Sequence, residues 1–195
     1  MLQLRDISSI DKMFFMQFSQ LKSYWHAEVI GTKKSFSYWR IFTRLRNKPG
    51  LSFLFWWRLA NYLYLNGHKR TAYRIHSRLK ARFACDIMLG ATIGEGLSIA
   101  HHVGIVISKR VIAGKNLQLT QNTVIGKTGN SDEAEIVIGD NVFIGTNSCI
   151  IGDFISIGDN VTIAAMSFVN KDIPSNSKVI TKKITEVKDD SARAA

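Results

Sequence analysis

A six-residue repeat of apolar side chains runs through the second half of this 195-residue chain. Its members each lie six positions after the last, in three runs: Ile87, Ile93, Ile99, Ile105, Val111 and Leu117, continued by Thr123; Ile138, Ile144 and Ile150; Ile157, Ile163 and Val169. A period of six is typical of neither a helix nor an ordinary strand. Short-period repetition indicates a solenoid, in which each repeat stacks on the next and buries one continuous core.

Each repeat predicts a short strand followed by a tight corner. Residues two apart on a strand share a face, so each hexad supplies two inward positions. Between residues 105 and 125 the second inward position falls after the repeat residue rather than before it. Three positions after the repeat residue, seven hexads carry a residue that tolerates left-handed backbone: Gly90, Gly96, Gly114, Gly126, Asn141, Asn147 and Asn160. The sequence therefore predicts a flat-sided parallel β-helix.

Two irregularities interrupt the repeat. The step from Ile150 to Ile157 is seven residues, so one residue within 152–155 must bulge. Residues 127–135 carry no inward pattern and are expected to form a loop extruded from the coils. In a regular solenoid such a loop is where function tends to be placed.

The first half of the chain differs from the second in charge. Residues 1–85 carry 16 Lys and Arg against 3 Asp and Glu, a net charge of +13, whereas residues 86–195 carry 10 against 12, a net charge of −2. We expect an α-helical basic region over 1–85, a β-helix domain over 86–180 and a polar tail over 181–195. Two cysteines form no disulfide framework, which indicates a reducing compartment, and the N-terminus shows no secretory signal pattern.

Four helices are expected in the basic region: about residues 8–26, capped at Ser8 or Ser9, then 35–46, 51–65 and 68–84, with Pro49-Gly50 ending the second. The third is apolar almost all round but shorter than the roughly 20 residues of a membrane span. It is interpreted either as a buried core helix or oligomer contact, or as an aromatic surface that rests on an anionic membrane beside the arginines of the fourth. Nucleic acid is the weaker explanation of the charge, because no recognised binding module accompanies it.

Two adjacent histidines, His101 and His102, are the only ones in the repeat region. His102 occupies the corner position of its hexad, and histidine is enriched among non-glycine residues with left-handed backbone. His101 precedes the corner and is expected to project from the coil, either as a surface residue or as a catalytic one. One adjacent pair does not suit a zinc site of three separated histidines.

From Asp86 to about Val179 the chain resembles the serine O-acetyltransferase group of hexapeptide-repeat acyltransferases, and more closely their relatives that acetylate exopolysaccharides, such as the colanic acid acetyltransferases. The resemblance rests on DIMLGATIGEGLSIAHHVGIVI, VIAGKNLQLTQNTVIGKTG and IGDNVTIAAMSFVNKDIP. It implies a left-handed β-helix with His101 as catalytic base and Asp86, fifteen residues earlier, as its carboxylate partner. A full turn of three hexads would stack Asp86 under Gly104, so that it reaches His101 around a corner.

The resemblance also implies a donor, acetyl-CoA, and no metal. A neutral imidazole suits removal of a proton from a hydroxyl that attacks a thioester. In this family acetyl-CoA lies along the coils between subunits of a homotrimer, and a dimer of trimers is the alternative assembly. By position, five residues would line the CoA site: Lys127, Gly145, Thr146, Ala164 and Ala165.

Two departures from the serine acetyltransferase pattern bear on the acceptor. Ala100 stands where that group has Asp, and the loop 127–135 lacks the His and Arg that bind the amino acid. Losing polar recognition groups costs specificity heavily. We therefore expect O-acetylation of a saccharide hydroxyl in capsule, exopolysaccharide or O-antigen synthesis, in the cytoplasm or at the inner face of its membrane. The alternatives are a serine O-acetyltransferase of cysteine biosynthesis and a non-enzymatic scaffold.

Overall fold

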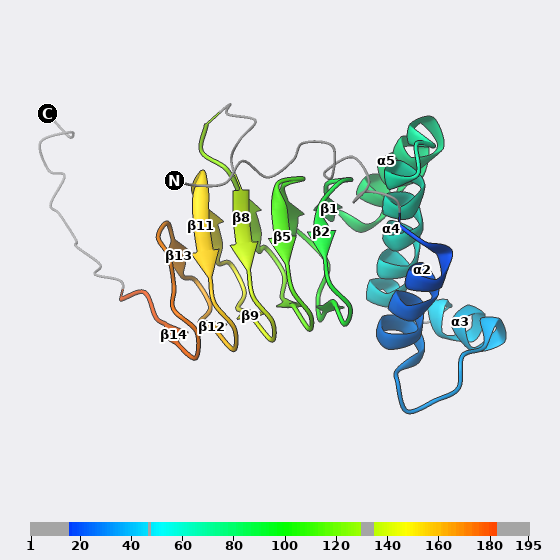
Figure 1. Ribbon diagram of the computed structural model, residues 1–195, viewed down its shortest axis with the longest axis horizontal. Helices are drawn as coiled ribbons and strands as arrows, with labels where there is room; N and C mark the ends of the chain where they lie inside the picture. The colour runs from blue at the N-terminus through cyan, green and yellow to red at the C-terminus, as the bar shows by residue number, and fades with distance from the viewer. Residues whose placement is uncertain (1–15, 47, 130–134, 183–195) are drawn as a thin grey trace, which may run out of the picture.

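The computed structural model describes residues 16–46, 48–129 and 135–182. A helical end and a prism of coils follow one another along the long axis of the molecule (Figure 1). The helical elements are α2 (Phe18–Trp25), the π-helix η2 (His26–Ile30), α3 (Tyr38–Leu45), α4 (Pro49–Leu65) and α5 (Lys69–Phe83). The strands are β1 (Asp86–Ile87), β2 (Thr92–Ile93), β3 (Ser98–Ile99), β4 (Val106–Ile107), β5 (Val111–Ala113), β6 (Gln118–Leu119), β7 (Val124–Gly126), β8 (Glu135–Ile138), β9 (Phe143–Ile144), β10 (Cys149–Ile151), β11 (Phe154–Ile157), β12 (Thr162–Ile163), β13 (Phe168–Val169) and β14 (Lys178–Val179).

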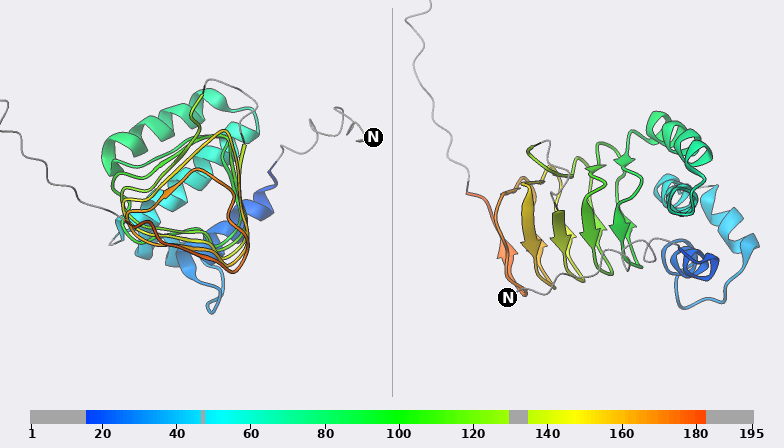
Figure 2. Two further views of the ribbon diagram at one scale, coloured as in Figure 1. Left: turned by 90° about the vertical axis from the view of Figure 1, so that its left-hand side faces the viewer. Right: turned by 45° about the horizontal axis from the view of Figure 1, so that its top comes forward.

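Three parallel sheets form the sides of the prism, and the chain visits them in turn. Sheet A has the order β1-β4-β7-β10-β13, sheet B the order β11-β8-β5-β2, and sheet C the order β14-β12-β9-β6-β3. Seen along the axis, the coils superpose as a triangle (Figure 2). The inward apolar residues of all three sheets form one core, as a solenoid requires. The prediction of a left-handed parallel β-helix behind N-terminal helices is confirmed.

The coils differ in length, and this corrects part of the predicted repeat. Asp86 pairs with Val106, twenty residues later, whereas Val106 pairs with Val124, eighteen residues later. Two extra residues therefore enter the corner before β4. The strand positions that follow are Ile107, Ala113, Leu119 and Ile125, not Ile105, Val111, Leu117 and Thr123. Both sets are buried, because both point inward two residues apart, so hydrophobicity alone could not separate them.

The corner residues shift with the strands. Five predicted corners are left-handed as expected: Gly90, Gly96, Asn141, Asn147 and Asn160. Gly114 and Gly126 are not, and the left-handed residues of that coil are Asn116 and Asn122, with φ of 58° and 56°. The predicted bulge is confirmed, since the extra residue of the fourth coil lies between Ile151 and Phe154.

Asparagines at the corner between sheets B and C form a column along the axis. The side-chain amide of Asn116 donates to Asn141 at 2.8 Å, Asn141 to Asn160 at 3.1 Å, and Asn160 to Asn176 at 3.0 Å. The left-handed backbone at each corner places these side chains in register. Each coil is therefore joined to the next by side chains as well as by its strands.

Helix α4 covers the open end of the first coil. An unpaired end of a sheet leaves backbone groups without partners. The Trp57 indole N–H donates to the Ile87 carbonyl at 2.8 Å, and Asn61 exchanges hydrogen bonds with Ala91 and Gly90 at 3.1 and 2.8 Å. The interpretation of residues 51–65 as a buried core helix is thereby confirmed.

A buried ion pair completes this cap. The Arg58 guanidinium binds both carboxylate oxygens of Glu28 at 2.6 and 3.1 Å and donates to the carbonyls of Ile93 and Gly94 at 2.7 Å each. Glu28 also accepts the Leu97 N–H at 3.1 Å. Burial raises the pKa of Glu28, whereas the charge and hydrogen bonds of Arg58 oppose that rise.

Two details of the predicted helices differ. Pro49 is the first residue of α4 rather than the end of the preceding helix, because a proline at that position gives up an N–H that has no partner there. The predicted caps Ser8 and Ser9 lie outside the described residues. Within the ranges described, no helix has the length and apolarity needed to cross a bilayer.

Candidate active site

The enlarged corner between β3 and β4 holds both histidines of the repeat region. Residue 102 is not left-handed; Gly104 is, with φ of 75°. A side chain on Gly104 would also meet the side-chain oxygen of Asn122 in the next coil. The prediction that His102 is the corner residue is therefore wrong, because the two inserted residues move the turn to Gly104.

The two histidines have different surroundings. His101 is exposed, in agreement with its predicted projection from the coil. His102 is half-buried, and its ring packs edge-to-face against Phe83 of α5 with centroids 5.4 Å apart. Burial lowers the pKa of His102, and the neighbouring His101 lowers it further. His102 is thus held neutral against the helical end, whereas His101 faces solvent.

The predicted carboxylate, Asp86, is held by α5. Lys80 Nζ lies 2.6 Å from Asp86 Oδ2, and His76 Nε2 lies 3.2 Å from Asp86 Oδ1. His76 Nε2 is also 3.1 Å from the Ile87 carbonyl, which is in hydrogen-bonding geometry, whereas Asp86 Oδ1 is buried without a hydrogen bond. Burial lowers the pKa of His76, and this outweighs the opposing effect of Asp86.

Within the described ranges, no ion pair or hydrogen bond joins Asp86 to His101. The predicted position of Asp86 under Gly104 is wrong, since the longer first coil places Asp86 under Val106. The sequence analysis missed His76 and Lys80 as partners of this carboxylate. Their spacing of four residues on one helix, just before an acidic residue, is the signal that could have indicated them.

Four of the five predicted CoA-lining residues share the corner between sheets C and A with His101. The ladder of this corner includes Asn147 N–H to Gln121 carbonyl at 3.2 Å and Met166 N–H to Thr146 carbonyl at 2.7 Å. Thr146 and Ala164 are half-buried and Ala165 is exposed, so all three reach the surface. Gly145 is buried, and a side chain there would collide with the backbone of Ala165, so stacking alone requires this glycine.

Lys127 lies elsewhere. It follows β7 at the corner between sheets A and B, where the predicted loop leaves the coil. The Asp153 carboxylate accepts the N–H groups of Thr128 and Gly129 at 3.1 Å each and fixes the first part of this loop. The hydrogen bond from Gly129 lowers the pKa of Asp153 most. One chain therefore does not bring Lys127 to the corner of His101.

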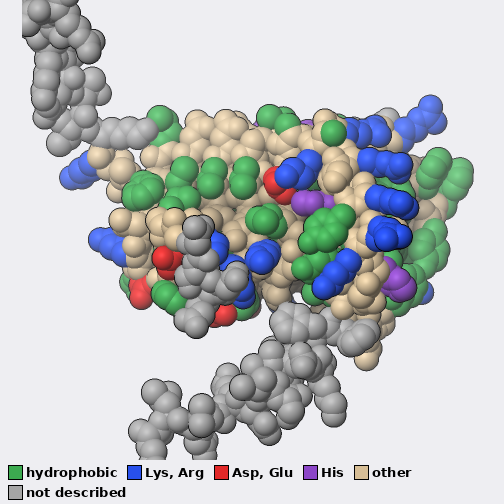
Figure 3. Space-filling model, turned by 90° about the horizontal axis from the view of Figure 1, so that it is seen from above, with side chains coloured by type: hydrophobic (Ala, Val, Ile, Leu, Met, Phe, Trp, Pro, Cys, Tyr) green, Lys and Arg blue, Asp and Glu red, His purple; other side chains and the backbone are tan. Residues whose placement is uncertain are grey.

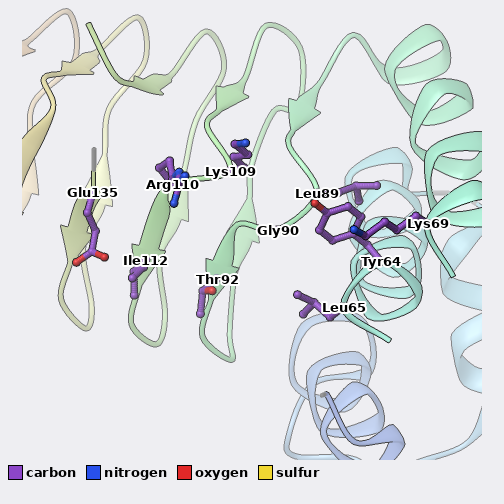
Figure 4. A pocket seen from close by; sticks show the side chains of 10 residues that line it. All are labelled: Tyr64, Leu65, Lys69, Leu89, Gly90, Thr92, Lys109, Arg110, Ile112 and Glu135. Atoms are coloured by element: carbon purple, nitrogen blue, oxygen red, sulfur yellow. The ribbon is translucent and has the colours of Figure 1, made fainter. Parts of the chain in front are cut away.

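A basic hollow of about 450 Å³ also lies at the corner between sheets A and B (Figure 4). Figure 4 shows Tyr64 and Lys69 reaching it from the helical end, and Lys109 and Arg110 from the coil. It is separated from His101 by a full side of the prism and is not part of the candidate site. No cluster of three or more potential metal ligands occurs in the ranges described.

The triangular coils and their six-residue repeat define the class of left-handed hexapeptide-repeat β-helices. A family model described as the hexapeptide repeat of succinyl-transferase matches residues 135–171. Serine acetyltransferase 1 (chloroplastic) of Arabidopsis thaliana is 36% identical over 124 residues, 63% of this chain and 39% of the relative. A serine acetyltransferase of Staphylococcus epidermidis is 37% identical over 124 residues, 63% of this chain and 57% of the relative.

Solved structures agree. The soybean serine acetyltransferase apoenzyme superposes with a TM-score of 0.73 at 27% identity, covering 84% of this chain and 67% of that one. The Neisseria gonorrhoeae serine acetyltransferase in complex with serine gives 0.67 at 27% identity, covering 90% and 68%. The chain belongs to the hexapeptide-repeat acyltransferase family, in its serine O-acetyltransferase-like group. The predicted closeness to exopolysaccharide acetyltransferases stays a prediction, because these relatives are all serine acetyltransferases.

Proposed function

We propose that the chain is an acetyl-CoA-dependent O-acetyltransferase. The observation that carries this proposal is an exposed histidine, His101, on the corner whose later coils present Thr146 and Ala165, in a family of acyltransferases. His101 accepts the proton of the acceptor hydroxyl while the hydroxyl oxygen attacks the thioester carbon. The C–S bond then breaks, and the imidazolium returns the proton to the leaving thiolate. Asp86 as orienting partner of His101 stays a prediction.

The comparisons favour serine as the acceptor. The relatives reported above are serine acetyltransferases, although the chain spans only 39% and 57% of the two curated ones. The saccharide acceptor expected from the sequence has no support among them. A serine O-acetyltransferase of cysteine biosynthesis is therefore the first candidate.

A saccharide hydroxyl is the second candidate, on the evidence of particular residues. Ala100 replaces the Asp that precedes the catalytic histidine in serine acetyltransferases, and residues 127–135 contain neither His nor Arg. A site built to bind the charged groups of an amino acid loses discrimination when those side chains are missing.

A direct assay separates the candidates. Purified protein is given acetyl-CoA with L-serine, with free sugars or with sugar nucleotides, and thiol release and acceptor mass are followed. Acetylation of one acceptor class identifies the substrate. If acetyl-CoA neither binds nor is cleaved with any acceptor, the chain is a scaffold and the proposal fails.

The placement of Lys127 supports assembly from several copies. Because Lys127 and Ala165 lie at different corners of one chain, a CoA site containing both requires a neighbouring subunit. We therefore propose a homotrimer with acetyl-CoA bound between coils of adjacent chains, and a dimer of trimers as the larger assembly.

We propose a cytoplasmic protein whose contact with an anionic membrane runs through α3 rather than through residues 51–65. Exposed aromatics concentrate there: Tyr38 is 56% exposed, Trp39 72% and Phe42 64%. Residues 29–85 contain 13 Lys and Arg and no Asp or Glu. Aromatic side chains flanked by cations suit an anionic lipid surface.

Vesicle sedimentation tests this contact. Changing Trp39 and Phe42 to Ser should abolish salt-sensitive binding to vesicles rich in phosphatidylglycerol. The matched control changes Phe154 and Phe168, which are 69% and 55% exposed on the β-helix, to Ser. Equal losses in both variants, or none in either, would remove α3 from the account.

A further inference from the structure

A groove between α4 and α5 leads to the corner of the candidate base. It consists of two adjoining hollows of about 260 and 290 Å³ that share Ser52, Arg82 and Phe83. The first is also lined by Trp56 and Arg78. Together the hollows reach the size of pockets that hold small molecules, about 300–1,000 Å³.

The second hollow ends at His102, beside His101. His102 is one of its lining residues, and its ring packs against Phe83. Consecutive Cα atoms are about 3.8 Å apart, so a ligand that reaches His102 lies next to His101. The groove therefore opens onto the proposed reaction site.

Three arginines give the groove its charge. Arg46, Arg78 and Arg82 are exposed, and within the described residues none of them forms an ion pair or donates a hydrogen bond. Both groove helices lie within the acid-free stretch 29–85, so no carboxylate on them competes with a ligand. Figure 3 shows Lys and Arg side chains gathered over this helical end. Arginine binds phosphate oxygens through two parallel hydrogen bonds, so the groove suits a multiply charged phosphate group.

The other end of the groove carries an aromatic side chain. Trp56 is 42% exposed although it lies on the largely buried helix α4. An indole face packs well against the apolar face of a sugar ring, while its N–H remains able to donate a hydrogen bond. Serine fits this surface poorly, because its ammonium group would meet three cations and no carboxylate.

We propose that the groove binds the acceptor as a saccharide attached to a diphosphate, with the diphosphate on Arg78 and Arg82 and one sugar hydroxyl directed to His101. This inference rests on the proposed O-acetyltransferase activity, and it favours the second acceptor candidate. A nucleotide or a polyprenyl lipid can carry the same glycosyl diphosphate.

Calorimetric titration of the full chain tests the groove separately from catalysis. The probes are UDP-glucose and a polyprenyl diphosphate glucose in detergent micelles, with free glucose and UDP for comparison. Arg78→Gln with Arg82→Gln should weaken binding of the diphosphate sugar at least about tenfold, as expected for lost charged hydrogen bonds. The control, Arg70→Gln with Arg74→Gln, removes the same charge from α5 outside the groove and should bind almost normally. Trp56→Ala should weaken UDP-glucose but not UDP.

The two probes distinguish the carrier, since only one of them should bind tightly. Failure of the unmodified protein to bind either probe, or equal weakening by both pairs of substitutions, would overturn the groove. So would serine acetylation that the Arg78 and Arg82 changes leave intact, although the proposed enzyme activity would then stand. Absence of acetyl-CoA binding and cleavage would instead remove the enzyme proposal.

Discussion

His101 and His102 are neighbours in the chain with different chemical surroundings. Changing His101 to Ala should lower kcat by about 10²–10⁴ and leave acetyl-CoA affinity nearly intact, as expected when a general base is lost. His102→Ala should cost much less in kcat, because His102 is packed against Phe83. Steady-state kinetics of both variants check this, and an inactive His102→Ala beside an active His101→Ala would contradict it.

His76 makes the stability of the fold dependent on pH. Its pKa is lowered from 6.5 by burial, so the unfolded chain binds the proton more readily than the folded chain does. The associated stability is present above about pH 6.5 and is lost as the pH falls through the folded pKa. His76→Gln should therefore reduce the loss of stability between about pH 7.5 and 5.5, measured by urea unfolding. The lowered pKa of His102 acts in the same direction and accounts for dependence that remains.

At single residues, the sequence predicted an exposed His101 but not the partners of Asp86. Local pattern is enough to place a side chain inside or outside a coil. The contacts of Asp86 with His76 and Lys80 come from the docking of α5 against β1, which no local pattern contains.

At the scale of elements, α4 is stabilised against the first coil by a charge that it cannot lose cheaply. Arg58→Leu should destabilise the protein by about 3–5 kcal/mol, because it leaves the carboxylate of Glu28 buried without its partner. Adding Glu28→Leu should recover part of that loss. Urea unfolding of the three variants measures both values, and a double variant less stable than Arg58→Leu would contradict this account.

The elements also show why the repeat could be predicted and its phase could not. Glycine and asparagine corners with an apolar period of six indicated the β-helix and its first three strands. The insertion before β4 stayed hidden because Ile105 and Ile107 are both buried on one face, so either could be the repeat residue. Gly104 is the residue that marks the true corner.

For the whole molecule, the separation of Lys127 from Thr146 predicts function in assembly only. Light scattering should give about three times the chain mass of 21.9 kDa, or six times if the helical ends also pair. Activity should fall on dilution below the assembly concentration. A fully active monomer would show that one chain suffices.

The parallel register also limits how this molecule can change in length. Thr162 pairs with Phe143, nineteen residues earlier, on the same sheet. Deleting six residues would rotate every later strand onto the next side of the prism and misalign the asparagine column. Deleting or duplicating a whole coil would return each strand to its own side and leave the column continuous. Insertions and deletions are thus quantised: the β-helix can grow or shrink by entire turns, while α4 continues to cover its first one.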